Sequence, residues 1–192
     1  MTQPQLPFRL SICGLDELPA FAAEGVSHVV SILDPDYPDP EDFAAFLPHR
    51  RAVLRFDDVI VTGDLYQAPG ANDVAAILNV GRELAADGAT HVLVHCHAGV
   101  SRSTAAAALL LAQRMPDAID DVFDEIHRVR PRSWPNSLIV RLGDAQLGLA
   151  GRLVAAMQRH HARVAVDYPE LAKLLRMGMR AHEVPDPSAP TG

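Results

Sequence analysis

Cysteine and lysine are both scarce in this sequence. Of the 192 residues, two are cysteines, Cys13 and Cys96, and one is a lysine, Lys173. Two cysteines are too few for a disulfide framework, and they are typical of a reducing compartment, where a single thiol can stay reactive. Arginine supplies nearly all of the positive charge, and this preference by itself indicates no function.

Long apolar segments and an excess of positive charge are also absent. The longest apolar run covers residues 105–112, which is far short of the roughly 20 residues that span a membrane. The N-terminus lacks the basic region and apolar run of a secretory signal. The net charge of -7 argues against nucleic-acid binding, which needs clustered lysine and arginine. We therefore expect a cytoplasmic protein whose partners include neither a membrane nor a nucleic acid.

The composition is that of a globular chain, with 48% hydrophobic and 21% charged residues. Its length is sufficient for one domain with a substantial core, and it contains no internal repeat and no interior low-complexity linker. We expect a single domain over residues 1–165, followed by a C-terminal extension over 166–192. The last residues, from about 183, have the composition of a loose tail.

Short β-branched segments alternate with helical patterns along the chain. Strands are predicted over residues 26–33, 52–56 and 90–95. Helices are predicted over residues 72–87, 101–115, 117–130 and 137–160. The second of these helices is apolar on nearly every face, so it is expected to be central and buried. The pattern predicts an α/β fold with a central, mostly parallel sheet flanked by helices and a helical C-terminal part.

The segment VHCHAGVSRST, residues 94–104, contains the residues best suited to chemistry. A strand ends in a short glycine-containing loop that opens a helix, and in such a loop successive N–H groups converge on one anion. Arg102 closes the loop and can bind two phosphate oxygens with its planar guanidinium. The same positive field favours a thiolate at Cys96, which we expect to be a nucleophile.

Two other interpretations of this segment are less favoured. One is a buried cysteine and a surface arginine brought together by chance, which the strand, the glycine and the following helix argue against. The other is a metal site formed by residues 95–97. Neighbours in an extended segment point in opposite directions, so they seldom bind the same metal ion.

The nine residues HCHAGVSRS, 95–103, resemble the phosphate-binding loop H-C-x-x-G-x-x-R-[ST] of the cysteine-dependent phosphatases. The internal Ala-Gly-x-Ser-Arg-Ser is most similar to the dual-specificity branch of the protein-tyrosine phosphatase superfamily. Flanking segments are also similar to those of the family, at residues 25–33, 54–58 and 129–142. The resemblance implies hydrolysis of a phosphorylated protein or another phosphomonoester through a phosphocysteine intermediate, with no metal and no cofactor.

The resemblance also implies roles for individual residues. Cys96 would attack phosphorus, and Ser103 would donate a hydrogen bond to its sulfur when it leaves. Arg102 would hold the phosphate together with the loop residues His97, Ala98, Gly99, Val100 and Ser101. His95 would orient the thiolate, or else is an ordinary buried residue at a strand end. Asn136 would support the loop.

A general acid is needed to protonate the leaving oxygen, and Asp57 and Asp58 are the candidates. We favour Asp58, because it lies on the same side of an extended chain as Leu54 and Phe56. The spacing from this acid to the cysteine is longer than in compact dual-specificity members. The additional residues fall in the loop 60–70, which could cover the site and which contains the next candidate, Asp64.

Phosphotyrosine, with phosphoserine or phosphothreonine as further substrates, is the favoured substrate class. A small-molecule, nucleotide or lipid phosphate is the alternative. A highly charged inositol phosphate would favour basic residues inside the loop, but residues 97–101 contain no lysine or arginine. A non-catalytic phosphate-binding module is disfavoured by the presence of the cysteine, the arginine and an upstream acid together. Outside the loop, Trp134 is expected to be a packing residue, and His160 and His161 to lie at a surface helix end.

Overall fold

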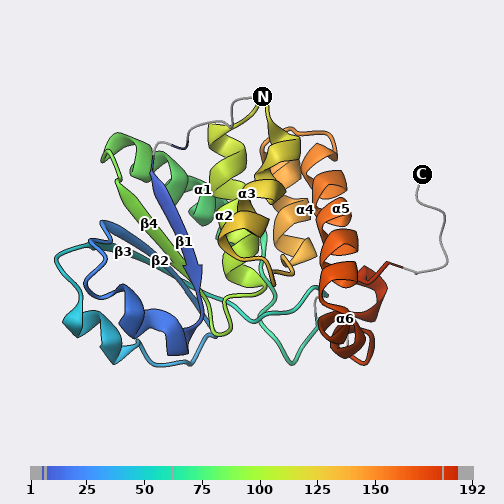
Figure 1. The fold of residues 1–192 in the computed structure, drawn as a ribbon, viewed down its shortest axis with the longest axis horizontal. Coiled ribbons are helices and arrows are strands. Elements are labelled where there is room, and N and C mark those ends of the chain that lie inside the picture. The colour runs from blue at the N-terminus through green and yellow to red at the C-terminus, as the bar shows by residue number, and fades with distance from the viewer. Residues whose placement is uncertain (1–5, 7, 62, 179, 186–192) are drawn as a thin grey trace.

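A computed structural model describes residues 6, 8–61, 63–178 and 180–185 (Figure 1). Its centre is a sheet of four strands in the described residues, β1 (Arg9–Cys13), β2 (His28–Leu33), β3 (Arg50–Arg55) and β4 (His91–His95). Every strand pair is parallel, in the order β1-β4-β2-β3. In a parallel sheet the carboxyl ends of all strands meet at one edge, which is where such folds bind ligands.

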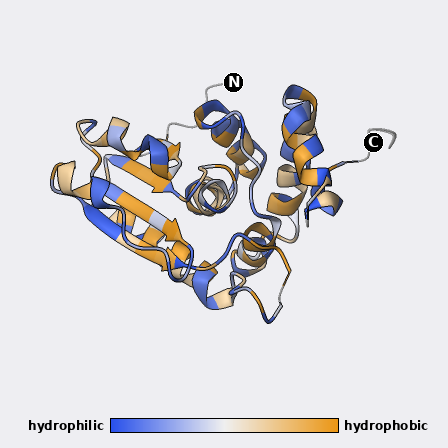
Figure 2. Ribbon diagram, turned by 90° about the horizontal axis from the view of Figure 1, so that it is seen from below, coloured by the Kyte–Doolittle hydropathy of each residue, from blue (hydrophilic) through white to orange (hydrophobic). Residues whose placement is uncertain are grey.

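The three predicted strands are present, and β1 is a fourth that the sequence did not indicate. β1 is only 5 residues long and lies at the edge of the sheet beside β4. A short segment with an arginine and a serine gives no clear β pattern, so its pairing with β4 stabilises it as a strand. The strands are largely apolar (Figure 2), as is typical of a sheet buried on both faces.

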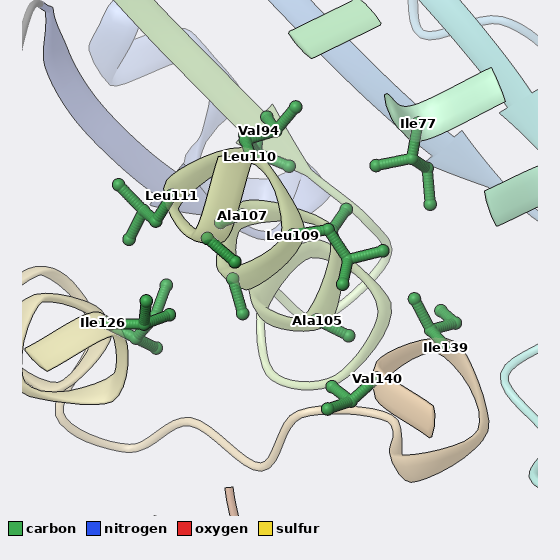
Figure 3. Close-up of a cluster of buried hydrophobic side chains, with 14 of the residues drawn as sticks. Ile77, Val94, Ala105, Ala107, Leu109, Leu110, Leu111, Ile126, Ile139 and Val140 are labelled. Atoms are coloured by element: carbon green, nitrogen blue, oxygen red, sulfur yellow. The ribbon is translucent and has the colours of Figure 1, made fainter. Parts of the chain in front are cut away.

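The α-helices cover one face of this sheet. They are α1 (Ala71–Ala86), α2 (Arg102–Arg114), α3 (Val122–Val129), α4 (Ser137–Gln146), α5 (Arg152–Asp167) and α6 (Pro169–Arg176). As its apolar sequence predicted, α2 is central, and residues 105–112 are buried on every side. Figure 3 shows its leucines surrounded by Ile77 of α1, Val94 of β4, Ile126 of α3 and Ile139 of α4.

The opposite face of the sheet is covered by shorter helical segments. Two short 3₁₀ segments lie there, η1 (Leu15–Phe21) and η2 (Glu41–Ala45). Alternate strand residues face the two layers: Val30 belongs to the helical core, whereas Val29 packs with Leu18 of η1. Prolines at positions 19, 35, 38, 40 and 48 interrupt these two connections and prevent longer helices.

The single helix predicted over residues 137–160 is wrong, because the chain turns between α4 and α5. Gly148, Ala150 and Gly151 all have positive φ, which ends a right-handed helix. The carboxylate of Asp144 then accepts hydrogen bonds from the N–H groups of Gly151 (2.7 Å) and Leu153 (2.9 Å) at the start of α5. The two short helices are therefore fixed against each other at this turn.

His160 and His161 are buried, contrary to the expectation of a surface helix end. The helix does not end there, since α5 continues to Asp167 and α6 follows it. His161 stacks on Trp134 with ring centroids 4.2 Å apart, and His160 shares a 2.9 Å hydrogen bond with Ser133. Burial lowers the pKa of each histidine to about 3. Trp134 is fully buried, as expected of a packing residue.

The predicted loose tail lies, from residue 186 on, outside the described residues. None of the helices in the described part of the chain is both long enough and apolar enough to cross a membrane.

Candidate active site

The loop 96–101 joins the carboxyl end of β4 to the N-terminus of α2. The ends of β1, β2 and β3 lie at the same edge of the sheet, so Gly14, Asp34 and Phe56 follow their strands next to this loop. Cys96 is almost fully buried, and its Sγ lies 3.1 Å from the Oγ of Ser103 in the first turn of α2. The structure thus brings together two of the residues that the loop motif singled out.

The carbonyl oxygens of the loop residues 97–101 are all hydrogen-bonded by groups outside the loop. Leu15 N donates to His97 O (2.9 Å), and Trp134 N donates to Val100 O (2.8 Å). Arg130 donates to Ala98 O and Gly99 O, each at 3.1 Å. The carbonyl of Ser101 accepts from Asn136 N at 3.3 Å and from Ala105 N at 3.0 Å.

This outward bonding determines where the loop N–H groups point. In a trans peptide the N–H lies opposite the preceding carbonyl, so the N–H groups of residues 98–102 point to the inner side of the loop. Within the described part of the chain, those of residues 98–101 donate to no protein group. Donors gathered in this way form a site for an anion, next to the Cys96 sulfur.

Gly99 lies where the loop passes close to the end of β1. Its φ is +67°, and a Cβ at this position would lie 2.5 Å from the carbonyl carbon of Cys13 and 2.6 Å from Gly14 N. Only glycine fits such a conformation next to backbone atoms. The cradle therefore depends on a glycine that is fixed against the end of β1.

Arg102 is buried and is oriented by two acceptors. Its Nη1 donates to the Oδ1 of Asp34 (2.5 Å) and to the carbonyl of Phe56 (2.7 Å). Its Nε is buried and has no partner among the described residues. Asp34 and Phe56 thus hold one side of the guanidinium and leave Nε for a ligand. Asp34 carries no signal in the sequence other than its place directly after β2.

Asp57 and Asp58 point to different surroundings. The Oδ1 of Asp58 accepts hydrogen bonds from Ser101 Oγ (2.6 Å) and Asn136 Nδ2 (2.9 Å), which places this carboxylate beside the loop. The carboxylate of Asp57 instead accepts from Gln67 N at 2.7 Å, within the connection that leads to α1. This arrangement agrees with the strand register that favoured Asp58, whose catalytic role stays a prediction.

The two histidines that flank Cys96 have different contacts. His95 is buried and shares a 2.6 Å hydrogen bond with Ser31 Oγ, which also accepts from Arg51 Nε at 2.8 Å. Burial, with the positive charge of Arg51, lowers the pKa of His95 to about 4, so its ring is neutral at pH 7. His97 accepts from the backbone N–H of Asp34 at 3.3 Å, and burial also lowers its pKa.

A pocket of about 780 Å³ opens above Cys96 and Arg102, with Asp58 at its side. Part of its wall comes from the loop and the segment after α3, through Val100, Pro131 and Trp134. The rest comes from the C-terminal segment, through Tyr168, Leu171, Leu174, Leu175 and Arg180. No local pattern indicates that this segment reaches the site, because nothing in the sequence of a helix marks its packing against a loop about 70 residues earlier.

No family model matches the sequence, and no curated protein matches it. Solved structures do match. The PTP-2 phosphatase of Cydia pomonella is 25% identical, with a TM-score of 0.55, over 71% of this chain and 84% of that one. Human DUSP28 is 17% identical, with a TM-score of 0.56, over 73% and 89% of the two chains.

A third similar structure is that of a human tyrosine phosphatase-like serine/threonine/tyrosine-interacting protein. It is 20% identical, with a TM-score of 0.52, over 72% of this chain and 87% of that one. Together these similarities show that the chain has the fold of the cysteine-dependent phosphatases. The solved structures that it resembles include tyrosine and dual-specificity phosphatases, which confirms both the predicted fold class and the resemblance carried by the loop.

Proposed function

We propose that the protein is a cysteine-dependent phosphatase that hydrolyses phosphotyrosine, with or without phosphoserine and phosphothreonine. The loop 96–102 is the observation that supports this most directly. The carbonyls of residues 97–101 are bonded outward and the N–H groups that follow them face inward, next to the Cys96 sulfur and to the Arg102 Nε, which has no partner in the part of the chain that the structure describes. Such preorganised donors stabilise the negative charge of a phosphoryl group in the transition state.

The proposed reaction has two steps. In the first, the Cys96 thiolate attacks phosphorus, so that an S–P bond forms as the bond to the leaving oxygen breaks, and Asp58 gives that oxygen its proton. In the second, Asp58 takes a proton from a water that attacks phosphorus, and the S–P bond breaks. The Oγ of Ser103, 3.1 Å from Sγ, would stabilise the departing thiolate. The loop N–H groups and Arg102 hold the phosphoryl oxygens throughout.

The polarity of the pocket walls bears on the class of substrate. Val100 of the loop and Tyr168 and Leu175 of the C-terminal segment give the pocket an apolar wall, and an aromatic ring can pack against such surfaces. A phosphorylated small molecule, nucleotide or lipid is the alternative substrate class. A cytoplasmic location and independence of metal ions stay predictions.

The test is hydrolysis of para-nitrophenyl phosphate by the full chain, with and without EDTA. We expect turnover in both conditions, and a loss of at least about 10³-fold in Cys96→Ser. Cys13→Ser is the matched control and should keep its activity. Mass spectrometry of the quenched reaction should find the added phosphoryl group on Cys96. Binding of tungstate without any turnover would indicate a non-catalytic module instead, and activity that EDTA abolishes would indicate a metal-dependent enzyme.

A further inference from the structure

The C-terminal segment returns to the candidate active site after α5. α6 supplies part of the pocket wall, and the chain then leads to Arg180 and to η4 (Ala181–Glu183). The side chain of Arg180 is only 13% exposed although it lies near the C-terminal end of the described residues. A guanidinium buried to this extent needs acceptors on several sides.

Each nitrogen of the Arg180 guanidinium has such an acceptor. Nε donates to Glu183 Oε2 at 2.5 Å, and Nη2 donates to the carbonyl of Pro135 at 3.2 Å. Nη1 donates to the Oγ of Ser101 at 2.6 Å. The last contact joins the C-terminal segment directly to the phosphate-binding loop.

The direction of this bond determines the direction of the next one. A guanidinium can only donate, so the hydroxyl of Ser101 accepts from Arg180, and its own hydrogen is available to Asp58. The Oγ of Ser101 lies 2.6 Å from Asp58 Oδ1. Arg180 therefore orients the hydroxyl that holds the carboxylate, and its Nη1 is itself 3.8 Å from that same oxygen.

One oxygen of Asp58 is thus occupied and the other is not. Oδ1 accepts from both Ser101 and Asn136, whereas Oδ2 makes no hydrogen bond among the described residues. Two donors on one oxygen fix the rotation of a carboxylate. They leave Oδ2 as the atom that can carry a proton to a leaving group.

Arg180 is anchored in turn by a buried acid. The side chain of Glu183 is 3% exposed and accepts from Trp134 Nε1 at 3.1 Å as well as from Arg180. Trp134 is fully buried and stacks on His161 of α5. The path from α5 to Asp58 therefore consists of packed rings and charged hydrogen bonds, which permit little movement.

We propose that Arg180 is a positioning residue of the active site, which fixes the Asp58 carboxylate through the Ser101 hydroxyl. This inference depends on the proposed function, in which Asp58 is the general acid. Proton transfer requires the donor to lie within hydrogen-bond reach of the leaving oxygen. A misplaced carboxylate then slows the reaction most where the leaving group most needs a proton.

The test compares Arg180→Gln with the wild type on para-nitrophenyl phosphate and on a phosphotyrosine peptide. We expect kcat to fall by about 10-fold on the peptide and by less than about 2-fold on the nitrophenyl ester, with KM nearly unchanged. Arg180→Lys should behave like Arg180→Gln, because an ammonium cannot bond Ser101, Glu183 and Pro135 at once. In Asp58→Asn, adding Arg180→Gln should cause no further loss, since both changes remove the same interaction.

Arg176→Gln is the matched control. Arg176 lies in the same segment and, within the described part of the chain, donates to Pro185 O alone, at 3.2 Å, so its loss should leave both rates unchanged. If Arg180→Gln does not fold, Glu183→Gln replaces it. This variant weakens the anchor of Arg180, and we expect the same selective loss on the peptide with a smaller amplitude.

The outcomes separate this inference from the proposed function. An equal loss on both substrates, or full additivity with Asp58→Asn, would show that Arg180 does not act through the acid, while the phosphatase would stand. A wild type that hydrolyses neither substrate would overturn the proposed function and this inference together.

Discussion

Gly99, Cys13 and Cys96 show how strongly single residues near the loop depend on their surroundings. Gly99 presses against the backbone of Cys13 and Gly14. Cys13 and Cys96 are both buried free thiols at neighbouring strand ends. Only one of these thiols lies under the inward N–H groups of the loop, and the two should therefore differ in reactivity.

Alkylation should distinguish the two cysteines. Burial, assisted by the negative charge of Glu17, raises the pKa of Cys13 to about 12, so this thiol stays protonated near neutral pH and does not react. We expect iodoacetamide at pH 6.5 to label Cys96 alone, and tungstate to protect it. Peptide mapping by mass spectrometry would measure both sites. Equal labelling of the two thiols would contradict the assignment of Cys96 as nucleophile.

Gly99→Ala should remove activity and destabilise the fold. The new Cβ would meet backbone atoms of Cys13 and Gly14 that cannot move without disturbing β1. Gly88→Ala is the control, because Gly88 has a similar positive φ of +65° with open space around it. That change carries only the conformational penalty, about 1 kcal/mol. Thermal melts and nitrophenyl phosphate assays of both variants measure the difference, and similar losses in the two would exclude close packing as the cause.

Asp58→Asn should slow hydrolysis according to the leaving group. A general acid contributes roughly 100-fold or more where the leaving oxygen is basic, so the phosphotyrosine peptide should lose at least that factor and the nitrophenyl ester far less. Asp57→Asn is the paired control, since the Asp57 carboxylate is bound by Gln67 N. Steady-state kinetics on the two substrates would decide. A selective loss in Asp57→Asn, or in neither variant, would place the acid elsewhere, with Asp64 examined next.

At the scale of elements, α2 and the loop before it are held between the sheet and the other helices. Residues 105–112 of α2 are packed in the core. Because Arg102 is the first residue of the same helix, this packing also positions the arginine. Around this centre the turn between α4 and α5 fixes the helices that carry Asn136 and His161. The carboxylate of Asp144 stabilises this turn by accepting hydrogen bonds from two N–H groups at the start of α5.

Asp144→Ala should lower stability and leave the chemistry intact. It would remove the acceptor of the N–H groups of Gly151 and Leu153, and the loss of such a cap reduces the free energy of unfolding by about 1–2 kcal/mol. We expect a decrease in Tm of several degrees, with kcat on nitrophenyl phosphate unchanged at 20 °C. Asp144→Asn keeps one acceptor oxygen, so its Tm should lie between those of the wild type and of Asp144→Ala. An unchanged Tm in the alanine variant would show that the turn does not need the carboxylate.

At the scale of the whole molecule, the parallel sheet brings distant parts of the chain to one edge. Asp34, Asp58 and Cys96 follow three different strands, and the C-terminal segment adds Arg180 from the far end of the sequence. The histidines that support this assembly are buried and neutral. Because these histidines are buried in the neutral form, the stability of the fold depends on pH.

Stability should decrease as the pH falls below about 6.5. The pKa of His160 and His161 is about 3 in the folded protein, whereas it is about 6.5 in an unfolded chain. The unfolded state therefore takes up protons first, and stability present above pH 6.5 is lost as the pH falls toward 3. At pH 5 each histidine lowers the free energy of unfolding by about 2 kcal/mol relative to its value above pH 6.5.

Urea unfolding at pH 7.5 and pH 5 measures this loss, with the fluorescence of Trp134, the only tryptophan, as the signal. His161→Gln should start less stable at pH 7.5, because it disturbs the stack on Trp134. Between pH 7.5 and pH 5, the free energy of unfolding of this variant should fall by about 2 kcal/mol less than that of the wild type. An identical pH dependence in the two proteins would mean that His161 does not remain neutral in the folded state.

The sequence alone determined the features that are local. The loop residues 95–103 are contiguous, so the cysteine, glycine and arginine could be identified from their spacing, and the fold confirms the resemblance they carry. Three strands and the central helix were likewise encoded by short apolar patterns. The register of β3 favoured Asp58 over Asp57, because alternation along a strand is also a local property.

Tertiary structure decided every contact between residues distant in the sequence. Asp34 lies 68 residues from the Arg102 it orients, and Arg180 lies 79 residues from Ser101. No local pattern marks such pairs, because they are formed by strand order and helix packing. The same reason explains the edge strand β1, the break after α4 and the burial of His160 and His161. Each depends on which surfaces meet in the folded chain, and only the packing of the whole molecule determines that.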